Sequence, residues 1–264
     1  MKMLALETTG STLGACLWED AAALRSKVAH DSESHSVQLV PMLHQLFREC
    51  RVSPAQLDAV AVDVGPGRFT GLRLGVVTAR TLGMVLQKPV VEVSSLEVLA
   101  AQSSGWEPAQ SFSWKFPWDL LCSLIEAPQE NVYVAAWRFH RASKKMSALG
   151  PAFKKRSTHS FGHHFKLVHA PCVFPFPRFQ SFFENCFSEQ KILFTGCVSK
   201  KIQDVLRRLF QKRCQMRMSD RPELQPRWVA ALAAEKYFRR EYKLYKDVHP
   251  LYLRPSYAEE ALMK

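Results

Sequence analysis

A glycine-rich loop between two apolar segments is the part of this chain best suited to bind an anion. The apolar run 59–64 predicts a buried strand, and residues 72–87 predict a helix. Gly65 and Gly67 lie between them, where backbone N–H groups and a helix N-terminus could face a phosphate. A tight turn in an α/β protein without any ligand explains the same glycines, so the loop alone leaves both interpretations open.

The elements around this loop follow in a regular order. Segments 3–7, 13–18 and 24–30 predict three strands, and 34–50 predicts a helix in which Ser34 is the N-cap and Pro41 causes a kink or a later start. The second half repeats this order more loosely. It predicts strands at 119–126, 131–139, 147–152 and 190–194, and helices at 198–211 and 226–241. These patterns by themselves indicate an α/β protein with an internal duplication.

The loop residues themselves are specific. The stretch Gly65-Pro66-Gly67-Arg68-Phe69-Thr70-Gly71-Leu72-Arg73-Leu74-Gly75 resembles the signature of the TsaB (YeaZ) family, whose members take part in bacterial synthesis of tRNA threonylcarbamoyladenosine. Further segments match the same family in order. They are 3–8, 35–41, 88–96 and 250–254. The resemblance is dense over residues 1–102, thin over 119–137 and absent over most of 138–220.

This resemblance implies a fold and a role. The fold is the duplicated, two-lobe actin-like ATPase (ASKHA) fold, with an N-terminal lobe at 1–102, a linker at 103–118 and a divergent C-terminal lobe at 119–264. The role is that of a non-catalytic subunit, which dimerises with a TsaD-type catalytic subunit and activates it. A TsaE-type ATPase drives turnover of that complex, and the catalytic metal belongs to the partner subunit. A homodimer of the isolated chain is an alternative.

The two long helices of the first half are the expected interface with the partner. Small residues spaced four apart on helix 72–87 form a ridge that another backbone could approach closely. Packing inside the same lobe is the competing explanation. The expected interface residues are Leu39, Leu43, Phe47, Leu72, Gly75, Val76, Ala79, Leu82 and Gly83.

Nucleotide chemistry is the rival function. In actin-like ATPases the loop after the first strand approaches phosphate, so Thr8 and Thr9 join Gly65 and Gly67 as candidate anion-binding residues. The family usually carries aspartate where this chain has Glu7, and the extra methylene would displace a carboxylate tuned to a metal-bound water. We therefore expect no cofactor of its own, and keep an independent ATP-binding or ATP-hydrolysing enzyme of the actin/sugar-kinase type as the alternative.

Metal chemistry finds little support in the sequence. TsaD carries an H-x-x-x-H metal pair, and the equivalent positions here are Ser95 and Leu99, of which leucine cannot bind a metal. His163, His164 and His169 with Cys172 have the right side chains but no compact ligand spacing. We expect no catalytic residue and no metal site in this chain.

Composition limits the remaining classes. The 264 residues are 47% hydrophobic and 23% charged, which is typical of a globular protein. Seven cysteines without a C-x-x-C pair, no evident signal peptide and no run near the length of a membrane span predict a cytoplasmic protein without a membrane partner. The net charge of +12, concentrated in the second half, predicts either indirect or transient contact with tRNA or a solvated basic surface.

Overall fold

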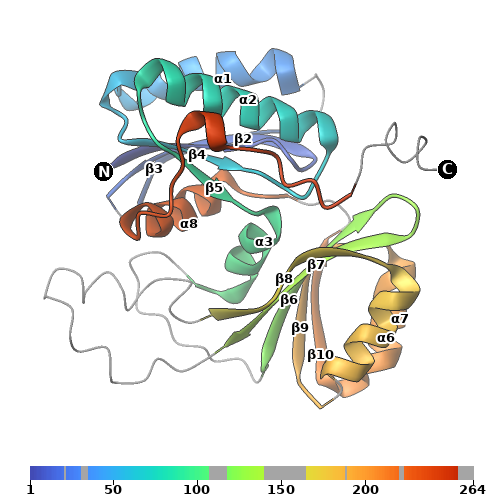
Figure 1. Cartoon of the computed structure of the whole chain (residues 1–264). Helices are drawn as coiled ribbons and strands as arrows, with labels where there is room; N and C mark the ends of the chain where they lie inside the picture. Colours follow the sequence, from blue (N-terminus) through green and yellow to red (C-terminus); the bar gives the residue numbers. More distant parts are fainter. Residues whose placement is uncertain are drawn as a thin grey trace, which may run out of the picture.

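The computed structural model describes residues 1–20, 22–30, 35–106, 118–139, 165–187, 189–219 and 223–254. They form two five-stranded sheets (Figure 1). The first contains β1 (Lys2–Glu7), β2 (Thr12–Glu19), β3 (Ala22–His30), β4 (Ala59–Asp63) and β5 (Val90–Val93), in the order β3-β2-β1-β4-β5. The second contains β6 (Leu120–Ala127), β7 (Asn131–Phe139), β8 (Phe165–Pro175), β9 (Ile192–Cys197) and β10 (Cys214–Ser219), in the order β10-β9-β6-β7-β8.

The second sheet repeats the first strand for strand. In each sheet the first three strands pair antiparallel, and the fourth and fifth are added in parallel beside the first. Read from its other edge, the second order is β8-β7-β6-β9-β10, which corresponds position by position to the first. The duplication predicted from the sequence is therefore present.

The described residues form six helices, which lie in three layers, one outside each sheet and one between the two sheets (Figure 1). They are α1 (His35–Cys50), α2 (Phe69–Leu86), α3 (Ser95–Ser104), α6 (Phe176–Phe187), α7 (Lys200–Phe210) and α8 (Pro226–Phe238). Helices α1 and α2 cover the outer face of the first sheet, and α6 and α7 cover the outer face of the second. Helices α3 and α8 fill the layer between the sheets. Short 3-10 turns occur at Pro54–Gln56, Gln211–Arg213 and Tyr245–Asp247.

Strand alternation builds this layered core. Successive side chains of a strand point to opposite faces of the sheet. On β1, Met3 and Ala5 therefore join the central core between the sheets, whereas Leu4 and Leu6 join the core under α1 and α2. All four side chains are fully buried. Because neither face of β1 meets solvent, residues 3–6 of its sequence are all apolar.

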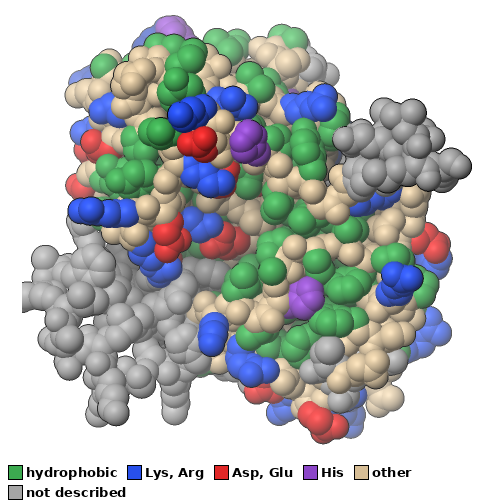
Figure 2. All heavy atoms as spheres, viewed as in Figure 1, with side chains coloured by type: hydrophobic (Ala, Val, Ile, Leu, Met, Phe, Trp, Pro, Cys, Tyr) green, Lys and Arg blue, Asp and Glu red, His purple; other side chains and the backbone are tan. Residues whose placement is uncertain are grey.

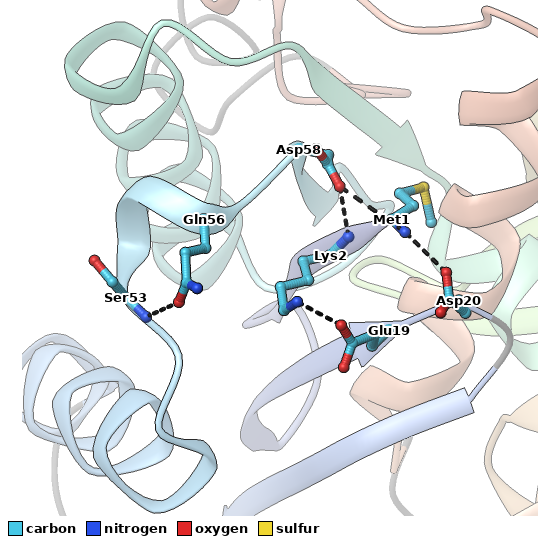
Figure 3. A network of polar contacts seen from close by, with 7 residues as sticks. All are labelled: Met1, Lys2, Glu19, Asp20, Ser53, Gln56 and Asp58. Atoms are coloured by element: carbon cyan, nitrogen blue, oxygen red, sulfur yellow. Dashed lines mark hydrogen bonds and ion pairs between the residues drawn. The ribbon is translucent and has the colours of Figure 1, made fainter.

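The amino end of β1 is held by polar contacts (Figure 3). The backbone N–H of Lys2 donates to Asp58 Oδ2 at 2.7 Å, and the Lys2 ammonium lies 2.5 Å from Glu19 on β2. In the adjacent turn, Ser53 N donates to Gln56 Oε1 at 2.8 Å. These contacts connect β1 to both of its neighbours and leave its carboxyl end, at Glu7, to the candidate site.

The boundary of the second lobe differs from the sequence prediction of 119–264. Helix α8 packs against the first sheet, and the segment after it continues along the same lobe. Val90 and Lys243 exchange backbone hydrogen bonds, and Leu251 N donates to Val64 O at 2.7 Å. Residues 226–252 thus complete the first lobe, because the apolar face of its sheet needs a cover that no earlier helix supplies.

The C-terminal segment also connects the two lobes. The Tyr252 ring lies 5.3 Å from the Phe69 ring at the start of α2, and its hydroxyl accepts a hydrogen bond from Arg73 Nε. Two residues later, Arg254 donates to Pro128 O and to Gln129 Oε1 in the turn between β6 and β7. This segment contains the motif at 250–254, which therefore has a structural role in holding the lobes together.

Several elements differ from the sequence expectations. Helix α2 begins at Phe69, three residues before the predicted start, and α1 begins before Pro41 and continues past it. The sequence analysis missed α3, β8, α6 and β10. Ser34, the predicted strand at 147–152 and most of the linker 103–118 lie outside the described residues.

One helix among the described residues, α2, is long and apolar enough by length and composition to cross a membrane. The sequence analysis expected no apolar run near the length of a membrane span, and α2 departs from that expectation. It lies against the first sheet with only one face buried, so its remaining apolar side chains face outward.

Phe183 is the centre of the core under α6 and α7, where five other phenylalanine rings surround it. Their centroids lie 4.6 to 6.3 Å from its own, and they belong to Phe179, Phe182, Phe187, Phe194 and Phe210. We predict that Phe183→Ala lowers the free energy of unfolding by about 3–5 kcal/mol, because a large cavity replaces a fully buried ring. Urea unfolding measures this change. Phe238→Ala is the matched control, since that ring is 37% exposed, and equal losses in the two variants would contradict the assignment of the core.

Candidate functional site

The carboxyl ends of β1 and β4 bring two buried acids together. Glu7 is the last residue of β1, and Asp63 is the last residue of the adjacent parallel strand β4. Ser95, the first residue of α3, follows the next parallel strand, β5. Parallel strands end at the same edge of a sheet, so these three side chains and Thr9 form one polar cluster. All four side chains are buried.

Glu7 is held by the loop that follows it. Its Oε1 accepts from Thr9 N at 2.7 Å, from Thr9 Oγ1 at 2.8 Å and from Gly10 N at 3.1 Å. The backbone N–H groups of this loop therefore point at a carboxylate of the chain itself. A phosphate at this position would have to displace Glu7 from those donors.

Asp63 is held in the same way by the glycine loop. Its Oδ1 accepts from Gly65 N at 2.8 Å and from Ser95 Oγ at 2.7 Å. Thr9 Oγ1 lies 3.3 Å from Asp63 Oδ2 and 3.1 Å from Ser95 Oγ, and so bridges the two acids. The polar groups of three strand ends thus satisfy one another without an external ligand.

The environment of the two acids opposes their simultaneous ionisation. Burial raises the pKa of Glu7 well above its usual value, and the negative charge of Asp63 raises it further. No N–H or O–H group of the described residues donates to Glu7 Oε2, so no donor stabilises a negative charge on this buried oxygen. Burial raises the pKa of Asp63 as well, so ionising both carboxyls at once is unfavourable.

Glycines on α2 allow the loop after β1 to approach the helix closely. A Cβ on Gly67 would lie 2.7 Å from Thr9 O, and one on Gly71 or Gly75 would overlap Thr8. Thr8 Oγ1 donates to Gly71 O at 2.6 Å, and Arg68 N donates to Thr9 O at 2.9 Å. The N-terminal turns of α2, where an anion would bind, are therefore in contact with the loop that follows β1.

The four candidate anion-binding residues, Thr8, Thr9, Gly65 and Gly67, do lie together. Their threonine hydroxyls, together with Gly65 N and Thr9 N, bond to protein groups. The sequence analysis did not single out Asp63, although its position at the end of an apolar strand was a usable signal. It also missed the Ser95 hydroxyl as a partner of that acid.

The expected interface residues are mostly in the wrong place for contact with a partner. Seven of the nine are buried inside the first lobe: Leu39, Leu43, Leu72, Gly75, Val76, Ala79 and Gly83. Phe47 and Leu82 are half-buried and pack on the same core. The small-residue ridge faces its own sheet, because its glycines let α2 pack against Thr8 and Val90. Packing within the lobe therefore explains the ridge, and those residues do not form an exposed interface.

Metal ligands do not gather in the described residues, where no group of three His, Cys, Asp or Glu side chains is placed to hold an ion. Ser95 donates to Asp63, and Leu99 is buried in the central core. His169 Nδ1 lies 3.6 Å from Cys172 Sγ, but burial raises the pKa of that thiol to about 11. His163 and His164 lie outside the described residues.

We predict that Glu7→Gln changes how stability depends on pH. The folded chain binds a proton on Glu7 that the unfolded chain releases above its ordinary pKa, so this contribution is complete below pH 4.5 and is lost as pH rises toward the raised value. Glutamine retains a neutral donor and does not titrate. Relative to the parent, the variant should gain stability between pH 5 and pH 8, by up to about 1.4 kcal/mol per pH unit. Urea unfolding at both pH values measures this change, and a difference in unfolding free energy that is constant with pH would contradict the raised pKa of Glu7.

Comparisons with known proteins place this geometry in a family. A family model described as TsaD, tRNA N6-adenosine threonylcarbamoyltransferase, matches residues 28–262. The chain is 31% identical over 139 residues to the tRNA threonylcarbamoyladenosine biosynthesis protein TsaB of Bacillus subtilis, a match that covers 53% of this chain and 56% of that protein. It is 32% identical to a tRNA N6-adenosine threonylcarbamoyltransferase of Anaeromyxobacter, over 41% of this chain and 38% of that enzyme. These matches span about half the length of the curated relatives, or less.

Solved structures extend the likeness to the whole fold. YeaZ from Pseudomonas aeruginosa superposes with a TM-score of 0.67 and 21% identity, and 96% of this chain and 99% of that chain are covered. A second Pseudomonas aeruginosa structure, described by its similarity to YeaZ, gives a TM-score of 0.69 at the same identity and coverage. The two-lobe actin-like fold expected from the sequence is confirmed. The chain belongs to the tRNA N6-adenosine threonylcarbamoyltransferase (TsaD) family, and the resemblance to TsaB (YeaZ) proteins that its sequence indicated is confirmed.

Proposed function

We propose that this chain is a non-catalytic subunit of a tRNA threonylcarbamoyladenosine synthesis complex, which dimerises with a TsaD-type catalytic subunit and activates it. The observation that carries the proposal is an apolar surface left exposed on α1 and α2. Its residues are Val37, Val40, Val77, Met84 and Val85, with exposed fractions from 45% to 68%. We call this the α1–α2 surface.

The α1–α2 surface has the composition of a helix-docking site. Val37 and Val40 are one helical turn apart on α1, and Val77 and Val85 are two turns apart on α2. Hydrophobic side chains are visible over these helices at the top of the first lobe in Figure 2. An amphipathic partner helix would gain affinity by burying these side chains. This surface replaces the ridge predicted from the sequence, since it uses the same two helices but their opposite faces.

The candidate site supports a role without chemistry. The donors at the strand ends already bond to Glu7 and Asp63, and the positions of the TsaD metal pair carry a hydrogen-bonding serine and a core leucine. Activation would then come from contacts that favour the competent conformation of the partner. We propose a cytoplasmic location, which six free cysteines among the described residues support. A TsaE-type ATPase would act on the assembled complex.

The test is reconstitution with the TsaD-type protein of the same organism. We predict stable association of the two chains and tRNA modification only when both are present with the other components of the pathway. Modification by this chain without TsaD, or no association, would contradict the proposal. Mass measurement of the isolated chain distinguishes a homodimer that uses the same surface.

Charged substitutions locate the contact. We predict that Val77→Glu with Val85→Glu weakens TsaD binding at least tenfold, because two carboxylates would be buried in an apolar contact. Val28→Glu is the matched control, since Val28 is 40% exposed on β3 and outside the surface. Binding by titration calorimetry and thermal unfolding should be measured on each protein. A folded double variant that binds as tightly as the parent would show that the α1–α2 surface is not the interface.

A further inference from the structure

The positive charge of this protein belongs entirely to its second half. Residues 1–102 contain nine Lys and Arg against ten Asp and Glu, so that half is nearly neutral. Residues 119–225, which form the second lobe, contain 18 Lys and Arg against eight Asp and Glu. A solubility requirement would be met by charge spread over the whole surface, whereas this excess is localised and calls for a local explanation.

Helix α7 carries a dense part of the excess on one face. Ile202, Leu206 and Phe210 recur every four residues and are buried in the core of the second lobe. Lys200, Lys201, Arg207 and Arg208 lie on the remaining face and are exposed. The helix is thus held rigidly by its apolar face while its basic face points into solvent.

The positive charge continues from α7 into the turn that follows it. Lys212 and Arg213 lie in the turn between α7 and β10. Arg217 on β10 is not part of this set, because it donates to Ser103 O of α3 on the other face of the sheet. We call this set the α7–β10 surface, and basic side chains are visible over α6 and α7 at the right of the second lobe in Figure 2. Its members are Lys200, Lys201, Arg207, Arg208, Lys212 and Arg213.

Few acids compensate this surface. Asp204 is the one acidic residue between positions 200 and 219 of the sequence, and it pairs with Arg207 at 2.8 Å. Lys201 pairs with Glu130 at 2.6 Å, and both side chains are about 70% exposed. Exposed pairs of this kind contribute little to stability, so an incoming anion of higher charge density can replace them.

The features of the surface select one kind of partner. Two pairs of cations, at 200–201 and 207–208, are separated by two helical turns, or about 10 Å, on a rigid element. No large apolar or aromatic side chain is exposed among the described residues from 200 to 219, so the surface lacks both an anchor for a protein segment and a platform for base stacking. Repeated cations without stacking groups match a phosphate backbone.

We propose that the α7–β10 surface binds the phosphate backbone of a folded RNA without reading its bases. The identification of this RNA as tRNA rests on the proposed function. The preference for phosphate groups rests only on the charges of the α7–β10 surface. The α1–α2 surface lies on the outer face of the other lobe, so an RNA and a partner subunit would not compete (Figure 1).

The experiment is fluorescence anisotropy of a labelled, unmodified tRNA titrated with the full chain at several salt concentrations. The test variant is Lys200→Ala with Arg208→Ala and Lys212→Ala. The matched control is Arg48→Ala with Arg80→Ala and Lys88→Ala, which removes the same charge from the first lobe. We expect the test variant to lose tenfold or more in affinity near 0.1 M salt and its log–log salt slope to fall by about two to three, and the control to bind as the parent does.

Two results would overturn the inference. Equal losses in the two variants would show that binding follows net charge alone, and competition by polyglutamate as effective as unlabelled tRNA at equal charge would indicate an acidic protein instead. Binding of TsaD to the test variant separates this inference from the proposed function. Retained TsaD binding with lost RNA binding is the expected result, whereas retained RNA binding with retained TsaD binding would refute the RNA surface and leave the partner role intact.

Discussion

The close approach between the loop after β1 and the first turns of α2 is the contact on which the first lobe depends. Gly67, Gly71 and Gly75 leave no space between the helix and the backbone of Thr8 and Thr9. This approach lets the loop fold back on Glu7, and it fixes the small-residue face of α2 against the sheet. The opposite, more apolar face is then left outside, where the proposed interface lies.

The same contact determines what the strand ends can do. In a doubly layered α/β lobe, the carboxyl edge of the parallel strands is where a ligand would be expected. Here Glu7 and Asp63 occupy that edge and bond to the loop N–H groups that a phosphate would need. The two carboxyls thus satisfy the buried donors of both loops from within the protein. The N–H groups of both loops therefore bond to carboxyls of the protein itself.

The sequence predicted the architecture better than the surfaces. The strand pattern and the family motifs were sufficient for two similar sheets, because alternation and order survive divergence. The interface residues were wrong because Gly75, Ala79 and Gly83 indicate close packing without indicating against what. Segments β8 and α6 are hard to recognise because they contain Pro171, Pro175 and Pro177, and proline is typical of turns and irregular segments. Pro175 nevertheless ends the strand, and Pro177 lies in the first turn of the helix, where its missing N–H costs nothing. Glu7 and Asp63 are 56 positions apart in the sequence, and their proximity follows only from the parallel pairing of β1 with β4.

The most direct measurement is calorimetric titration of Mg-ATP into the isolated, full chain. The account predicts no saturable binding up to about 1 mM, because the donors at the strand ends are bonded to Glu7 and Asp63. Tight, saturable ATP binding that is lost in Thr8→Ala would contradict it, and would make this chain a nucleotide-using enzyme rather than a partner subunit.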